Sequence, residues 1–192
     1  MADLQTRVVN ILTKPKEEWA VIAAETTDAK TLTTSYIAIL AAIPPAAAFI
    51  GLSIIGIGTF LGTTYRIGIV HGLSSAIVQY VLSIVGVHLA AIVIDKLAPT
   101  FKSQPSAIQS LKLVAYASTA SWVAGVLNIL PPLSPLAILA GLYGIYLFYL
   151  GMTPMMKTPE DQVIPYMVVS AVVVIVVMFV AGALATALTV AL

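Results

Sequence analysis

The stretch that decides the fold is TSYIAILAAIPPAAAFIGLSII, which covers Thr34–Ile55 without a single charged residue. At about 1.5 Å per residue, a helix of this length reaches roughly 33 Å, enough to cross a hydrocarbon core of about 30 Å. Pro44 and Pro45 lie inside this run, and they are expected to kink the helix because proline cannot donate a backbone hydrogen bond. The run therefore predicts a membrane-spanning helix with a break near its middle.

Four further apolar runs follow along the chain, separated by segments that contain glycine, proline or charged residues. The predicted spans cover residues 34–55, 67–94, 107–130, 135–150 and 164–192. The fourth run is short, roughly 24 Å as a helix, so it either crosses a locally thin region or forms a re-entrant element. The fold prediction is all-α: a polytopic membrane helical bundle with a five-helix transmembrane domain over residues 34–192.

The composition agrees with this class. Hydrophobic residues make up 60% of the chain and charged residues 9%, with a mean hydropathy of +1.04. A soluble domain carries roughly 25% charged residues, so a surface this poor in charge must partly face lipid. The net charge of +1 offers no basic face for nucleic acid. There is no cysteine, which excludes disulfides and thiolate chemistry.

Lysine and arginine set the expected orientation, because they are enriched in cytoplasmic segments. With five spans and a cytoplasmic N-terminus, the outside carries Arg66 alone. The inside carries the other eight basic residues: Arg7, Lys14, Lys16, Lys30, Lys96, Lys102, Lys112 and Lys157. The sequence therefore predicts an integral membrane protein with its N-terminus in the cytoplasm and its C-terminus outside.

Residues 1–33 are predicted to form a cytoplasmic amphipathic segment. Apolar residues recur there at helical spacing from Leu4 to Leu12, and a second short helix is expected to begin at Pro15. Trp19 suits the headgroup region, where an indole can be half apolar and half wet. One interpretation is a membrane-surface anchor at Pro15 and Trp19. The other is a cap packed against the cytoplasmic ends of the spans, and the two are compatible.

Few polar residues lie within the predicted spans. His88 and Asp95 share one face of the second span but lie about 10 Å apart along its axis, too far for a direct hydrogen bond. His88 fits either a neutral histidine bonded between helices or a proton relay, and Asp95 fits a solvated helix end. Gln79 and Asn128 could join an internal polar network or simply bond between helices. These four residues are the candidate functional polar residues.

Small residues also recur at helix-packing spacing, at Ala47 and Gly51 and again at Ala117, Ser121 and Gly125. Such ridges let backbones approach closely, and they are interpreted as packing.

The patterns of common enzyme classes are missing from the sequence. It contains no H-E-x-x-H, no G-x-S-x-G, no phosphate-binding G-x-x-x-x-G-K-[ST], and no pair of carboxylates within a span. An intramembrane hydrolase would need a nucleophile with a base, or clustered metal ligands. We therefore expect a protein that is not an enzyme and that has no cofactor, no metal site and no catalytic residues.

Three segments together resemble the Yip-domain family in its minimal prokaryotic form. Pro15 and Trp19 are similar to the family's P-x-x-x-W element, and the run from Ala115-Tyr116-Ala117-Ser118 to Leu130-Pro131 resembles its middle helix. The third segment looks like the family's Y-x-x-Y-L-x-x-x-G-x-P-x-x-x-K pattern, with spacing that differs by one or two residues. Its matching residues are Tyr143, Tyr146, Gly151, Pro154 and Lys157.

The resemblance implies a compact five-helix membrane domain with a cytoplasmic N-terminus and no catalytic residues. Its minimal prokaryotic form implies a location in a prokaryotic plasma (inner) membrane. The resemblance also implies, by analogy with eukaryotic members, a link to small GTPases and vesicle traffic. The function expected is non-enzymatic, through binding of membrane lipids or of a protein partner, as a homo-oligomer or within a membrane complex. The alternative is a small channel or transporter with a polar path near His88, Gln79 and Asn128.

Overall fold

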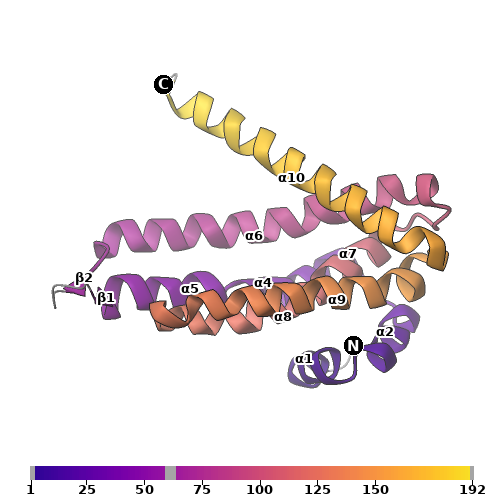
Figure 1. The fold of residues 1–192 in the computed structure, drawn as a ribbon, viewed down its shortest axis with the longest axis horizontal. Coiled ribbons are helices and arrows are strands. Elements are labelled where there is room, and N and C mark those ends of the chain that lie inside the picture. The colour runs from indigo at the N-terminus through magenta and orange to yellow at the C-terminus, as the bar shows by residue number, and fades with distance from the viewer. Residues whose placement is uncertain (1–2, 59–63, 191–192) are drawn as a thin grey trace.

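The protein is described here by a computed structural model that covers residues 3–58 and 64–190, with side chains as far as Val176. Its long helices lie side by side, and the last one, α10 (Glu160–Val190), leaves the bundle obliquely (Figure 1). Two short antiparallel strands, β1 (Ile57–Gly58) and β2 (Thr64–Tyr65), form a hairpin. The other elements in this part of the chain are helical, so the all-α prediction is confirmed.

Among the described residues, four helical segments are long and apolar enough to cross a membrane. They are Ala29–Ile55, Ile69–Phe101, Ala107–Ile129 and Pro131–Met156. The chain is therefore an integral membrane helical bundle. The predicted fifth span falls on α10, and the end of that predicted span, at residues 191 and 192, lies outside the described residues.

The first span is not one regular α-helix. It is divided into α3 (Ala29–Leu32), the π-helical turn η1 (Thr33–Ile37), α4 (Ala38–Ala41), α5 (Ile43–Phe49) and the π-helical turn η2 (Ile50–Ile55). The expected break lies between α4 and α5, so that Pro44 and Pro45 occupy the first turn of α5, where no backbone donor is needed. Gly125 in the third span lets the Pro44 ring approach, since a Cβ there would lie 2.5 Å from Pro44 Cγ.

The third span forms the centre of the bundle, and the second span packs against it. The second consists of α6 (Ile69–Leu97) and the 3-10 turn η3 (Ala98–Phe101), and the third of α7 (Ala107–Ala117), α8 (Thr119–Ala124) and the 3-10 turn η4 (Gly125–Ile129). Every residue of α7 from Ser110 to Ala117 is buried, because α7 packs against both α6 and α9.

The fourth span is longer than its sequence predicted. A 3-10 turn, η5 (Pro131–Leu136), precedes α9 (Ala137–Met156), which continues through Gly151 and Pro154 instead of ending at Leu150. Its 20 residues reach about 30 Å, the thickness of the hydrocarbon core. Burial of Met155 and Met156 holds the last turn in place, so tertiary packing overrides the helix-breaking tendency of Pro154.

Two turns meet at one end of the bundle. The backbone N–H of Gln104, between η3 and α7, donates to the carbonyl of Met156 at the end of α9, with an N···O distance of 2.8 Å. The hydroxyl of Ser103 donates to the hydroxyl of Thr158 over 2.9 Å. The α6–α7 and α9–α10 turns therefore lie side by side, and the β hairpin lies at the opposite end (Figure 1).

Two short helices, α1 (Leu4–Thr13) and α2 (Pro15–Ala24), form an N-terminal helical hairpin that packs against the side of the bundle, with α2 nearer the end where those turns meet (Figure 1). Trp19 of α2 is fully buried and meets Tyr116 of α7 edge to face, with ring centroids 6.3 Å apart. Gly151 of α9 makes room for the indole, since a Cβ there would lie 2.8 Å from the ring. Trp19 is thus buried between α7 and α9, and the hairpin packs tightly onto the bundle.

A charged side chain fastens this hairpin from within. Arg7 of α1 is only 1% exposed, and its guanidinium pairs with the carboxylates of Glu18 and Glu25. The same guanidinium lies 5.6 Å from the centroid of the Tyr116 ring, in a cation–π contact. The two acids and the tyrosine surround Arg7, which offsets the cost of removing its charge from water.

Backbone carbonyls of α2 also bind side chains of α7. The ammonium of Lys112, 2% exposed, donates to the carbonyl of Ile22 over 2.9 Å and to that of Glu25. The amide of Gln109 donates to the carbonyl of Ala23 over 3.2 Å. The C-terminal end of α2, which would otherwise leave carbonyls unpaired, is thereby satisfied by the central helix.

We predict that Arg7→Met lowers the free energy of unfolding by about 3 kcal/mol, because it leaves the buried Glu18 carboxylate without a partner. Removing both charges in Arg7→Met/Glu18→Met should restore part of that loss, since the half-buried Glu25 is then the carboxylate left without its partner. Thermal unfolding in detergent measures both effects. Lys16→Met, at an exposed site on the same hairpin, is the control and should unfold like the wild type. Equal melting of Arg7→Met and wild type would contradict this account.

Candidate functional site

The structure separates the polar residues that the sequence analysis grouped. Gln79 and His88 are nine positions apart on α6, which places them on opposite faces of that helix. Gln79 is exposed, whereas His88 is half-buried. The His88 ring contacts the hydroxyl of Thr33 through Nε2 at 3.1 Å and the carbonyl of Ile84 through Nδ1 at 2.9 Å. This is the geometry of a histidine that bonds between helices.

Asp95 and Asn128 lie at opposite ends of the bundle. Asp95 is half-buried in the last turn of α6, next to the exposed Lys96. Asn128 is in η4, where its backbone carbonyl faces Gly51 of η2 near the β hairpin. The four candidate polar residues therefore do not share a cavity. Among the described residues, no three His, Asp or Glu side chains come together as a metal site requires.

The family-like residues of α9 contact the N-terminal helical hairpin. The Tyr143 hydroxyl donates to the carbonyl of Leu12 at the end of α1 over 2.8 Å, and Gly151 receives the indole of Trp19. Tyr146 lies beside Tyr143, with centroids 5.8 Å apart, and is 44% exposed. Two of the motif residues thus serve as the docking surface of the hairpin.

The last two motif residues end α9, and Pro15 begins α2. Pro154 lies in the final turn of α9, and Lys157 follows it in the left-handed conformation with φ 54°. Pro15 occupies the first position of α2, where its missing N–H costs nothing. These three residues shape the ends of helices.

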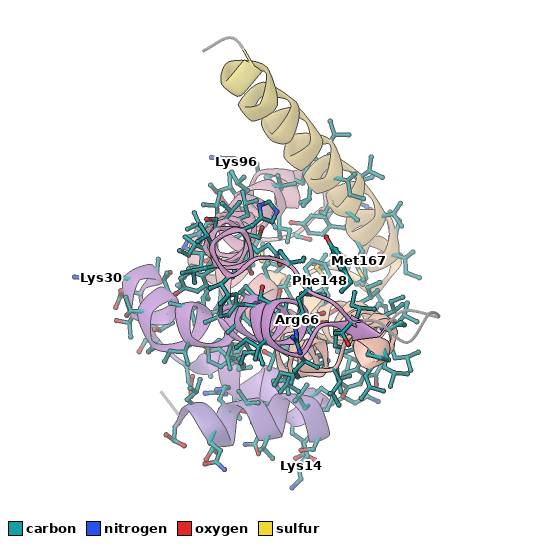
Figure 2. The ribbon with its side chains drawn as sticks, turned by 90° about the vertical axis from the view of Figure 1, so that its left-hand side faces the viewer. Lys14, Lys30, Arg66, Lys96, Phe148 and Met167 are labelled. Atoms are coloured by element: carbon teal, nitrogen blue, oxygen red, sulfur yellow. The ribbon has the colours of Figure 1, made fainter. Side chains whose placement is uncertain are left out.

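A groove opens where α10 separates from the rest of the bundle. It has a cavity volume of about 420 Å³ and lies between α6, α7, α8, α9 and α10. Phe148 of α9 and Met167 of α10 both line it, and they lie close together between the bundle and α10 (Figure 2). We refer to this cavity as the α9–α10 groove.

The walls of the α9–α10 groove are straight stripes along the helices. The α9 wall contains Gly141, Gly144, Ile145 and Phe148, and the α10 wall contains Met167, Ser170, Ala171 and Val174. Both sets repeat at i, i+3, i+4 and i+7, which is one face of a helix.

Three serines are the polar residues of the lining, Ser118, Ser121 and Ser170. Ser118 donates to the carbonyl of Val114 over 2.8 Å, so its hydroxyl is already satisfied within the helix. Ser170 is 3% exposed, and its hydroxyl has no hydrogen-bond partner among the described residues. The groove is therefore apolar apart from the hydroxyl groups of Ser121 and Ser170.

The sequence analysis did not select the groove residues as a site. Ala117 and Ser121 were interpreted as part of a packing ridge with Gly125. Gly125 does pack against Pro44, but Ala117 and Ser121 line the groove. A signal was present in the helical repeat of small residues from Gly141 onward, but such repeats occur at any close helix contact.

Comparison with known proteins identifies a family but no individual relative. No curated protein matches the chain, and no solved structure matches it either. The family model of the Yip1 domain matches residues 9–182, which include the second half of α1, all of α2, the four membrane-spanning segments and most of α10. The matched range also contains all the residues on which the sequence resemblance was based. The chain belongs to the Yip1 domain family.

Proposed function

We propose that this membrane protein is not an enzyme and that it acts by binding a lipid or a protein partner at the α9–α10 groove. The observation that carries the proposal is the groove itself, an apolar cavity of about 420 Å³ among helices of membrane-spanning length. Ligand sites are typically apolar clefts with a few placed polar groups. Ser170 and its unpaired hydroxyl are such a group.

The use of charge in the bundle supports binding over catalysis or transport. The buried charged residues among the described ones are Arg7, Glu18 and Lys112, and all three fasten the N-terminal helical hairpin. A transporter or intramembrane enzyme needs ionisable groups along a path or around a reaction centre. Here they hold helices together.

Five spans with a cytoplasmic N-terminus fit the arrangement of the turns. Because Gln104 bonds to Met156, the turns that carry Lys102 and Lys157 lie on one side of the membrane, together with the N-terminal helical hairpin. Helix α9 must then cross, as α7 does. From that side α10 extends over 31 residues, about 46 Å, which is long enough for a fifth span. We place this side in the cytoplasm of a prokaryotic cell, following the basic residues.

Single cysteines test this topology, because the chain contains none of its own. In intact cells, a membrane-impermeant maleimide should label Tyr65→Cys in the β hairpin and a cysteine added after Leu192. It should label Lys16→Cys and Lys157→Cys only after permeabilisation, since both exposed sites face the cytoplasm. Labelling of Lys157→Cys in intact cells would mean that α9 does not cross. Failure to label the added C-terminal cysteine would leave four spans.

The rival function is a channel or transporter that uses His88. We expect no proton or ion flux in proteoliposomes at neutral pH, either for the wild type or for His88→Leu. The substitution should cost only about 1 kcal/mol of stability, the modest value of a hydrogen bond between membrane helices. A wild-type flux that disappears in His88→Leu, with unchanged thermal unfolding, would favour the transporter and overturn the binding function.

A further inference from the structure

We infer that the α9–α10 groove holds one acyl chain of a membrane phospholipid, lying parallel to the helices. This inference rests on the proposed binding function and names the ligand of the same site.

The shape of the groove is that of an extended chain. Its α9 wall runs from Gly141 to Phe148 and its α10 wall from Met167 to Val174, each over seven helical steps or roughly 10 Å. Because both walls follow helices that cross the membrane, the long axis of the groove lies along the membrane normal. Lipid acyl chains have the same average direction.

The volume of the groove suits a single chain. An engineered cavity of about 150 Å³ holds a benzene, so by proportion the groove holds on the order of 15 carbon atoms. The cavity volume of about 420 Å³ therefore accommodates a segment of one hydrocarbon chain.

The chemistry of the lining excludes a column of water. Each ordered water needs two to four polar partners, and the serines of the groove provide few. Ser118 is already bonded to Val114, and Ser170 offers one buried hydroxyl. An unfilled cavity would forfeit dispersion contacts along all its walls. Hydrocarbon is the filling that restores those contacts without demanding hydrogen bonds.

The depth of the groove places it among acyl chains. Phe148 lies eight residues before the end of α9, and Met167 lies seven residues after the start of α10. The groove thus begins roughly 10–12 Å from the cytoplasmic end of these helices and continues inward. Ile145 and Val168 line the groove and are 59% and 56% exposed, which shows that it opens sideways to the surrounding lipid.

The experiment uses photo-crosslinking in proteoliposomes of phosphatidylethanolamine and phosphatidylglycerol. The probe is a phosphatidylethanolamine with a diazirine midway along one acyl chain. After irradiation, peptide mass spectrometry should find the wild type labelled at Phe148, Met167 or Ser170 well above the level at Ile77. That residue is exposed on α6 and contacts only passing lipid.

Filling the groove should remove this labelling. Gly141→Phe suits the purpose, because a Cβ at that position meets nothing within 4 Å and the ring can enter the cavity without displacing backbone. Labelling of the groove residues should fall roughly tenfold, since the ring takes volume that the chain needs. Ala171→Phe fills the groove from the opposite wall and should act alike. Val78→Phe, on the exposed face of α6, is the matched control and should label like the wild type.

Three results would overturn the inference. In the first, labelling of the groove in the wild type is no higher than at Ile77. In the second, a correctly folded Gly141→Phe is labelled as fully as the wild type. In the third, lipid labelling is absent and the wild type instead forms crosslinked dimers that Gly141→Phe abolishes. The last result would assign the groove to a second copy of the chain and would preserve the proposed binding function. A wild-type ion flux, in contrast, would remove the proposed function whatever the labelling shows.

Discussion

A bilayer offers no water to backbone amides and carbonyls, and this constraint governs the rest of the structure. Thr34–Ile55 and the later apolar runs can therefore cross the bilayer as helices, whose backbone groups bond to one another. Where Pro44 and Pro45 remove donors, the chain starts a new helical segment at that point, with π-helical turns on either side. The break is tolerated because Pro44 lies against Gly125 inside the bundle and so is covered by protein.

Within this apolar bundle, the buried charged side chains hold helices together. Arg7 pairs with Glu18 and Glu25 inside the N-terminal helical hairpin, and Lys112 of α7 binds carbonyls at the end of α2. Trp19 fills the space that Gly151 leaves open on α9. This contact explains two of the family-like residues of α9, because Tyr143 and Gly151 contact the hairpin. The Yip1 domain, in this chain, is therefore a bundle of membrane-spanning helices with an N-terminal cap built into its packing.

A neighbouring stripe of α9 lines the groove where we propose binding. While one side of this helix carries the N-terminal helical hairpin, the stripe from Gly141 to Phe148 faces the cavity beside α10. Small residues on this stripe keep the cavity open, and the oblique departure of α10 gives lipid access to it (Figure 1). A hydrocarbon ligand in the groove would complete the packing between α9 and α10.

The sequence by itself determined the membrane-embedded all-α class, the apolar runs, the break at the proline pair and the family. Each follows from composition or local pattern, because a span must be long, apolar and helical wherever it lies. The tertiary structure decided the burial of Trp19, the extension of α9 to Met156 and the separation of Gln79 from His88. It also created the groove from residues on five helices. These features depend on which faces meet across the bundle, and the pattern of one helix does not specify which other helix each of its faces will contact.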